Sequence, residues 1–260
     1  MPEQDASQDL SERIRWTTTD AFELNGVRFL SSHYGADRAT ADAQGAIWVM
    51  KGPDLLALYG SWVGEPRTIV EIGVAGGGGA ALLNEAYAPD KLVAIDLQDT
   101  TTEAFKRYCE GPRGGAIARY LDVDQSNQNR LDEIVATEIG DAPLDLVIDD
   151  ASHFYEPSVA TFETLFPRLR PGGVYVLEDW GWAHWPGELW QGRSSGRRGQ
   201  TSLTNMVHQI VMASASNPRW VERIMITSAG AVFVRGPDAI GPRTPLQNYY
   251  INRGRPFRFS

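Results

Sequence analysis

The chain has 260 residues, of which 42% are hydrophobic and 22% charged, and its formal net charge is −9. This fits one large α/β domain, or a core domain with an added terminal segment. The negative charge disfavours nucleic acid and anionic membranes as the main partner, because both select for basic surfaces. No apolar stretch approaches the roughly 20 residues of a membrane span, the acidic start does not resemble a signal peptide, and the one cysteine, Cys109, excludes an internal disulfide framework. We therefore expect a cytoplasmic protein that binds neither nucleic acid nor a membrane.

The beginning of the chain differs in pattern from the rest of the sequence. Residues 1–60 are predicted to be helical and irregular, and the run WVMKGPDLLALYGSWV has apolar positions at helical spacing, interrupted by Gly52 and Pro53. We expect them to form an N-terminal helical cap segment. The main domain is then expected at 61–240, with a C-terminal tail at 241–260.

From Arg67 onward, short apolar runs alternate with helical stretches. The runs are TIVEIGV, KLVAIDL, AIARYLDV, LDLVIDD and VYVLEDW. Strands that are apolar on both faces and alternate with helices indicate a parallel sheet covered on both sides. After a loop rich in Gly, Ser and Arg at 186–202, a helix is expected near Leu203, and ERIMITSAGAVFVRG predicts a terminal hairpin.

A glycine-rich turn, in TIVEIGVAGGGGAALLNEA, joins the first of these strands to a helix. In a doubly wound sheet such a turn holds a nucleoside ligand at the helix amino terminus, and an acid ending the next strand, here Asp96, binds the ribose. Gly76, Gly78 and Ala81 formally fit a dinucleotide fingerprint. Glu71 favours S-adenosylmethionine (SAM) instead, because its carboxylate would repel a pyrophosphate and attract a cationic amino group.

Two of the predicted strands end in paired acids, Asp149-Asp150 and Glu178-Asp179. The carboxyl ends of neighbouring strands meet at the ligand crevice, so we expect these four carboxylates to converge. Such a cluster needs a countercharge, and oxygen ligands suit Mg²⁺ or Mn²⁺. His153 follows Asp150 by three residues and is predicted to be the general base beside the cation.

The glycine turn resembles the first motif of class I methyltransferases, an acid-x-Gly-x-Gly/Ala-x-Gly sequence. This resemblance implies a Rossmann-like α/β fold, in which a seven-stranded, mostly parallel sheet carries a C-terminal antiparallel hairpin and helices on both faces. It also implies SAM as cofactor. The cofactor-binding residues would be Glu71, Gly73, Ala75, Gly77 and Asp96, together with Asp124, Gln125 and Ser126 after the third strand, where that family binds adenine.

The motifs Ile148-Asp149-Asp150-Ala151-Ser152-His153 and Leu177-Glu178-Asp179 resemble the signature of metal-dependent sugar O-methyltransferases of antibiotic and glycolipid pathways, a group related to the cephalosporin hydroxylase family. The resemblance spans roughly Arg67 to Trp180. It implies Asp150, Glu178 and Asp179 as metal ligands, His153 as catalytic base and Asp149 as a supporting or cofactor-contacting acid. Ala151 stands where that family usually has glycine, a mild change if its φ is negative.

Aromatic residues follow the second acidic motif. Trp180, Trp182, His184 and Trp185 are candidate substrate contacts, because aromatic faces beside a metal crevice suit a sugar or a polyketide. Packing of a hairpin or of a subunit contact explains the tryptophans equally well.

Our hypothesis from the sequence is an Mg²⁺-dependent O-methyltransferase that methylates a sugar hydroxyl of a small glycoside and forms a homo-oligomer. Three alternatives remain open. They are a catechol-type O-methyltransferase acting on an aromatic diol, a nicotinamide-dependent oxidoreductase, and a noncatalytic protein that binds SAM.

Overall fold

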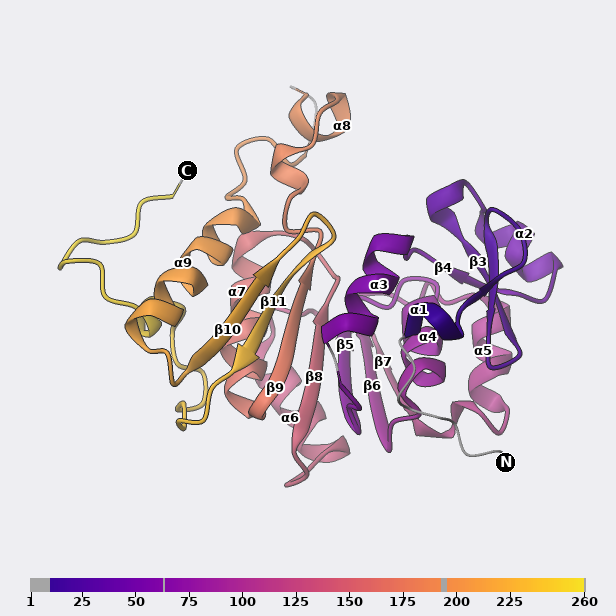
Figure 1. Ribbon diagram of the computed structural model, residues 1–260, viewed down its shortest axis with the longest axis horizontal. Coiled ribbons are helices and arrows are strands. Elements are labelled where there is room, and N and C mark those ends of the chain that lie inside the picture. Colours follow the sequence, from indigo (N-terminus) through magenta and orange to yellow (C-terminus); the bar gives the residue numbers. More distant parts are fainter. Residues whose placement is uncertain (1–9, 63, 193–195, 260) are drawn as a thin grey trace. The chain divides into compact units, whose positions relative to one another are not determined.

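The computed structural model describes residues 10–62, 64–192 and 196–259 (Figure 1). The chain divides into two compact units, Met1–Asp122 and Val123–Ser260. The longest described helix, α9 (Leu203–Ser216), has 14 residues, so none of the described helices is long enough to cross a membrane.

The first unit begins with a four-stranded sheet of order β1-β2-β3-β4, in which β3 and β4 are parallel and the other pairs antiparallel. The strands are β1 (Arg15–Trp16), β2 (Ala21–Leu24), β3 (Val27–Ser31) and β4 (Ile47–Val49). Asn25 and Gly26 join β2 to β3, and both have a positive φ, as in a two-residue hairpin turn. The helices of this segment are α1 (Leu10–Arg13), η1 (Ser32–Tyr34), α2 (Arg38–Ala43) and α3 (Pro53–Trp62).

These four strands correct the expectation that residues 1–60 are helical and irregular. Three of them, β1, β2 and β4, have only 2, 4 and 3 residues. Runs this short carry too little alternation to predict a strand from the sequence. Residues 1–9 lie outside the described part, and the division into 1–60, 61–240 and 241–260 stays a prediction.

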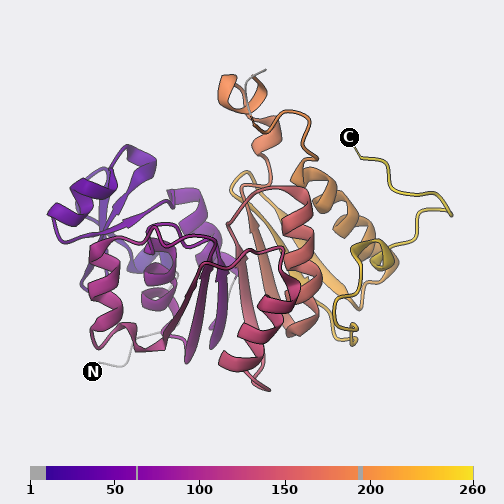
Figure 2. The same ribbon diagram turned by 180° about the vertical axis from the view of Figure 1, so that it is seen from behind.

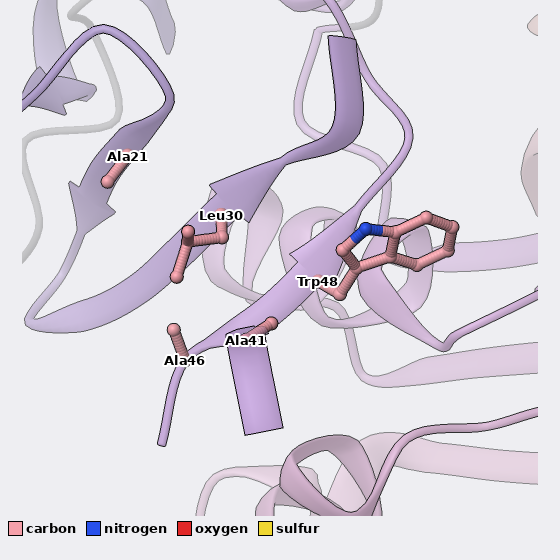
Figure 3. Packing of buried hydrophobic residues seen from close by; sticks show 5 residues of the cluster. All are labelled: Ala21, Leu30, Ala41, Ala46 and Trp48. Atoms are coloured by element: carbon pink, nitrogen blue, oxygen red, sulfur yellow. The ribbon is translucent and has the colours of Figure 1, made fainter. Parts of the chain in front are cut away.

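A small buried cluster packs α2 against this sheet (Figure 3). It consists of Ala21, Leu30, Ala41, Ala46 and Trp48. The Trp48 indole extends away from the alanines (Figure 3) and donates a hydrogen bond to the carbonyl of Ala36 at 2.8 Å. The cluster thereby fixes the position of the Trp48 ring in the first unit.

The rest of the first unit contains the strands β5 (Thr68–Ile72), β6 (Lys91–Asp96) and β7 (Ile117–Leu121), which pair in parallel. Every residue of β5 is buried, whereas none of β7 is, as expected for a central strand and an edge strand. The helices are α4 (Gly78–Tyr87), α5 (Glu103–Glu110) and the single turn η2 (Gly114–Ala116).

The second unit is built on four strands. β8 (Leu144–Asp149) and β9 (Leu169–Glu178) are parallel, β11 (Gly230–Arg235) pairs antiparallel with β9, and β10 (Val221–Ile226) pairs antiparallel with β11. Figure 2 shows α6 (Gln128–Glu138), α7 (Tyr155–Leu165) and α9 on one face of these strands. Phe162 of α7 lies at the centre of the core there, with ring centroids 5.1 Å from Tyr175 and 6.2 Å from Phe233. The remaining elements are η3 (Phe166–Arg168), η4 (Trp182–His184), α8 (Glu188–Gln191) and η5 (Leu246–Tyr249).

The seven-stranded sheet has the strand order β10-β11-β9-β8-β5-β6-β7. The predicted fold class is thereby confirmed: an α/β fold with a mostly parallel sheet, flanking helices and a C-terminal antiparallel hairpin.

Candidate active site

The glycine turn between β5 and α4 is organised by Asp96, at the end of β6. Its Oδ2 accepts hydrogen bonds from the backbone N–H groups of Val74 at 2.7 Å and Ala75 at 2.8 Å. Gly73 and Gly77 have φ values of 91° and 92°, which glycine adopts without a steric penalty. The Asp96 carboxylate, at the end of β6, therefore holds the turn in this conformation. Asp96 itself is half-buried.

The glycines of this turn allow close packing within the first unit. A Cβ on Gly76 would lie 2.7 Å from the Trp48 ring, and a Cβ on Gly78 would lie 2.1 Å from the Trp48 carbonyl oxygen. A Cβ on Gly77 would meet the Phe105 ring at 2.1 Å. Two of the residues that formally match a dinucleotide fingerprint, Gly76 and Gly78, thus also allow close contact with β4.

Glu71 is 1% exposed and lies beneath the first turn of α4. A Cβ on Gly79 would come within 2.0 Å of its Oε1, so this carboxylate sits directly under the helix amino terminus. The positive end of the helix dipole stabilises a negative charge at that position. A direct contact of Glu71 with a cofactor amino group stays a prediction.

The predicted adenine-binding stretch splits into exposed and buried residues. Asp124 Oδ1 accepts hydrogen bonds from Ser126 N and Ser126 Oγ, both at 2.8 Å, and both residues are exposed. Gln125 is buried, and its Oε1 accepts a hydrogen bond from Ser152 N at 2.9 Å. Its Nε2 donates to Thr161 Oγ1 at 3.0 Å and to Asp149 Oδ1 at 3.2 Å. Gln125 therefore links the end of β8 to the turn after that strand.

Asp149, the last residue of β8, is 1% exposed. Tyr175 Oη donates a hydrogen bond to its Oδ2 at 2.8 Å. Burial raises the pKa of Asp149 to about 7, and the hydrogen bonds from Tyr175 and Gln125 oppose that rise. This acid is part of the interior of the second unit.

Asp150, His153 and Asp179 form a group in which one ligand atom of each residue lies within 4.8 Å of the others. His153 Nε2 is 3.8 Å from Asp150 Oδ1, and the two side chains are 10% and 20% exposed. His153 and Asp179 have positive φ values of 56° and 53°, a conformation that is unfavourable by about 1 kcal/mol or more for residues other than glycine. Such strain at two of three members is typical of a functional site.

The group differs in one member from the predicted ligand set. Among the described residues it contains His153 and not Glu178, which is the last residue of β9 and 2% exposed. Ala151, next to Asp150, does not have a positive φ, so alanine is accommodated where the related signature has glycine. The ligand roles of Asp150, Glu178 and Asp179 and the role of His153 as base stay predictions.

A cavity of about 450 Å³ opens beside this group. Its lining includes His153, Asp179, Trp180 and Trp182, and it also includes Trp190 and Arg197 from the segment in which the sequence predicts only a loop. The Trp182 ring packs on the imidazole of His153, with centroids 4.0 Å apart. The contacts of Trp190 and Arg197 were not predicted, because residues in an irregular segment give no periodic signal for where they pack.

The other predicted aromatic contacts lie beside the cavity. His184 and Trp185 are not among its lining residues. His184 Nε2 lies 2.6 Å from Thr204 Oγ1, and Trp185 is 39% exposed with its ring packed on Trp190. Trp180 lines the cavity, and its indole N–H donates to the carbonyl of Thr227 at 2.9 Å. Trp180 and Trp182 therefore remain the better candidates for substrate contact.

Residues 70–180 match the family model described as a methyltransferase domain. This segment holds the glycine turn, both acidic strand ends and His153. Together with the sheet order, this match makes the segment similar to a class I methyltransferase domain, and the chain resembles the macrolide and rhamnosyl sugar O-methyltransferases.

Two curated relatives carry that resemblance. The 8-demethyl-8-alpha-L-rhamnosyl tetracenomycin-C 2'-O-methyltransferase of Streptomyces olivaceus is 40% identical over 126 residues, which cover 46% of this chain and 30% of the relative. The mycinamicin VI 2''-O-methyltransferase of Micromonospora griseorubida is 36% identical over 126 residues, which cover 46% of this chain and 28% of the relative. The matched region thus spans less than a third of each relative.

A solved structure agrees with this grouping. The MycE methyltransferase from the mycinamycin biosynthetic pathway, in complex with Mg and SAH, is similar with a TM-score of 0.51 and 26% identity. The similarity covers 69% of this chain and 47% of that chain.

Proposed function

We propose that the protein is a metal-dependent O-methyltransferase that transfers the methyl group of SAM to a sugar hydroxyl of a glycoside. The observation that carries this proposal is the group of Asp150, His153 and Asp179 at the ends of two neighbouring strands of a methyltransferase domain. The relatives' names give the acceptor class, since they methylate a rhamnosyl tetracenomycin and mycinamicin VI.

The donor set of this group fits a hard divalent cation. Asp150 and Asp179 supply carboxylate oxygen ligands of the kind that Mg²⁺ and Mn²⁺ prefer, and the His153 imidazole lies beside them without being needed as a ligand. Ligand atoms within 4.8 Å of one another fit one ion, because ligands on opposite sides of such a cation are separated by about 4 to 5 Å. Asp150 and Asp179 would hold Mg²⁺ or Mn²⁺, with Glu178 as a further predicted ligand. A bound cation supplies positive charge that orients acceptor oxygens and favours loss of a hydroxyl proton.

His153 would accept the proton of the reacting hydroxyl at one of its imidazole nitrogens. Its carboxylate neighbour Asp150 stabilises the imidazolium that results. The Trp182 ring fixes the plane of the imidazole and keeps water from one of its faces. The indoles of Trp180 and Trp182 would receive the apolar face of the acceptor.

For the cofactor, we propose that the turn of the first unit holds SAM through Gly73, Ala75, Gly77 and the half-buried Asp96. This proposal is supported by the hydrogen bonds that Asp96 accepts from the backbone of the turn. They place the Asp96 carboxylate beside the turn that leads into the amino terminus of α4. Glu71 would contribute its negative charge from beneath that turn.

The test is methyl transfer from radiolabelled SAM to a panel of acceptors. The panel contains mycinamicin VI, a rhamnosylated tetracenomycin, p-nitrophenyl α-L-rhamnopyranoside and the aromatic diol 3,4-dihydroxybenzoate. We expect transfer to at least one rhamnoside or macrolide sugar, its loss in EDTA, and its recovery with Mg²⁺ or Mn²⁺. Transfer to the diol alone would favour a catechol-type enzyme, and full activity in EDTA would contradict the metal role.

We further propose that the protein works as a cytoplasmic homo-oligomer. Exposed apolar side chains of the C-terminal segment support self-association, since Ile251 is 78% exposed and Phe259 is 56% exposed. Light scattering coupled to gel filtration would give a multiple of the 28.7 kDa chain mass, and a mass of one chain would contradict the proposal.

A further inference from the structure

One wall of the proposed acceptor cavity comes from a single segment, residues 197–202, here called the cavity wall. Residues 197 to 202 all line the cavity. Within 196–200, Arg197 is the one half-buried side chain and its neighbours are exposed. Arg197 therefore anchors the first part of the wall, and Ser202, which is hydrogen-bonded to Asn205, anchors its end.

The Arg197 guanidinium lies between two indoles. Its Cζ is 4.7 Å from the ring centroid of Trp182 and 4.9 Å from that of Trp190. The two rings are 4.6 Å apart and tilted by 53°, so they form a notch that receives the planar cation. A guanidinium stacked on two aromatic faces gains cation–π attraction from both.

Both indoles are fixed on their other sides. The Trp182 ring packs on the imidazole of His153. Trp190 belongs to α8, and its neighbour Gln191 donates from Nε2 to the carbonyls of Ala183 and Trp185, both at 2.9 Å. The contacts thus form a continuous series from the imidazole through Trp182 to Arg197 and the cavity wall.

We propose that Arg197 is a positioning residue that fixes the cavity wall, and with it the space for the methyl acceptor, by seating its guanidinium between Trp182 and Trp190. Arg197 does not touch the reacting atoms in this account. Its removal frees the wall and loosens the ring that packs on His153. The inference rests on the proposed function only for what the cavity accepts.

Hydrogen exchange of the whole protein tests the structural part without any acceptor. The probe is the Gln200 amide, which donates to the carbonyl of Arg197 at 3.1 Å and so reports on the turn of the wall. We expect exchange in peptides covering 198–202 to quicken at least threefold in Arg197→Leu and in Trp190→Ala. The exchange rate of Arg197→Lys should lie between those of these two variants and the wild type, because the lysine ammonium keeps the charge but lacks the planar face that stacks on the indoles.

Arg198→Leu is the matched control, since Arg198 lines the same cavity from the same segment and is exposed. Its exchange should equal that of the wild type. Wild-type exchange in Arg197→Leu, or an equal rise in Arg198→Leu, would overturn the proposal. If Arg197→Leu fails to fold by circular dichroism, the Arg197→Lys result decides by the same criteria.

Kinetics with p-nitrophenyl α-L-rhamnopyranoside as acceptor test the consequence for catalysis. Arg197→Leu should raise the acceptor KM at least fivefold and leave the KM of SAM within twofold, whereas a general loss of structure would move both. The Arg197→Leu/Trp190→Ala double variant should change the acceptor KM by less than the sum of the two single effects, because the Arg197–Trp190 contact is lost in each single variant. Additive effects, or a change in the KM of SAM alone, would contradict the inference. The exchange experiment needs no acceptor, so it tests this inference even if the protein shows no methyl transfer. Faster exchange in Arg197→Leu without any methyl transfer would support the inference and contradict the proposed function.

Discussion

Asp149 and Asp150 are neighbours in the sequence but have opposite environments, and the same holds for Glu178 and Asp179. Asp149 and Glu178 end their strands and are 1% and 2% exposed. Asp150 and Asp179 come directly after the strands and join His153. The last residue of each strand keeps the buried environment of the strand, whereas the next residue lies in the loop, where the backbone changes direction, as the φ of 53° at Asp179 shows. The sequence located the acids, but the point at which each strand ends decides which of them meet.

The buried member of the first pair predicts a pH dependence of stability. The pKa of Asp149 rises from its ordinary 3.8 to about 7 on folding, mainly because burial disfavours the carboxylate. The folded protein therefore binds this proton more tightly than the unfolded chain, and the free energy of unfolding falls as pH rises from about 4 to about 7. The Asp149→Asn variant has no carboxyl group to titrate at this position, so its free energy of unfolding should not fall for this reason. Its stability relative to the wild type should therefore increase by about 2 to 3 kcal/mol from pH 5 to pH 8.

Urea denaturation at pH 5 and pH 8, with EDTA present to remove bound metal, measures this difference. Asp141→Asn is the control, because Asp141 is exposed and its variant should follow the wild type at both pH values. Parallel behaviour of Asp149→Asn and the wild type would show that Asp149 is ionised throughout this range.

Residue-level contacts between distant segments were the part of the site that the sequence did not reveal. Trp190 and Arg197 lie in a segment rich in glycine, serine and arginine, where neither helical nor strand periodicity marks a buried face. Their stacking depends on where α8 and η4 fold back, which is a tertiary property.

At the scale of elements, close contact with β4 explains two of the four consecutive glycines, Gly76 and Gly78. The Gly78 Cα faces the backbone of Trp48 and Val49, which cannot move aside as a side chain can. We expect Gly78→Ala to lower the free energy of unfolding by at least about 2 kcal/mol, because a methyl group there overlaps the neighbouring strand.

Gly115→Ala is the matched control, because a Cβ at Gly115 meets no atom within 4 Å. Chemical denaturation of both variants gives the comparison. Equal stability of Gly78→Ala and Gly115→Ala would mean that α4 and β4 are not in close contact.

The strands of the main sheet were predictable because each is a run of apolar residues buried on both faces, as in β5, β6 and β8. The hairpin of β10 and β11 was predictable from two strand-like runs around a short turn. The strands β1, β2 and β4 were not, because they have only 2, 4 and 3 residues, and β4 pairs with β3 across the intervening η1 and α2. Local sequence does not encode such a pairing.

At the scale of the whole molecule, the fold class, the match of residues 70–180 and the resemblance to sugar O-methyltransferases agree with one another. The matched region spans less than a third of the curated relatives, so the acceptor and the activity of the full protein are proposals. The net charge of −9 is consistent with a small-molecule acceptor rather than nucleic acid.

The central claim is that acids from two strand ends hold one divalent cation beside His153, and a Mn²⁺ titration followed by electron paramagnetic resonance tests it most directly. The whole protein should show a saturable Mn²⁺ site from which Mg²⁺ displaces the ion, and the Asp150→Asn/Asp179→Asn double variant should lose it while Asp141→Asn retains it. No saturable site in the wild type, or undiminished binding in the folded double variant, would contradict the account.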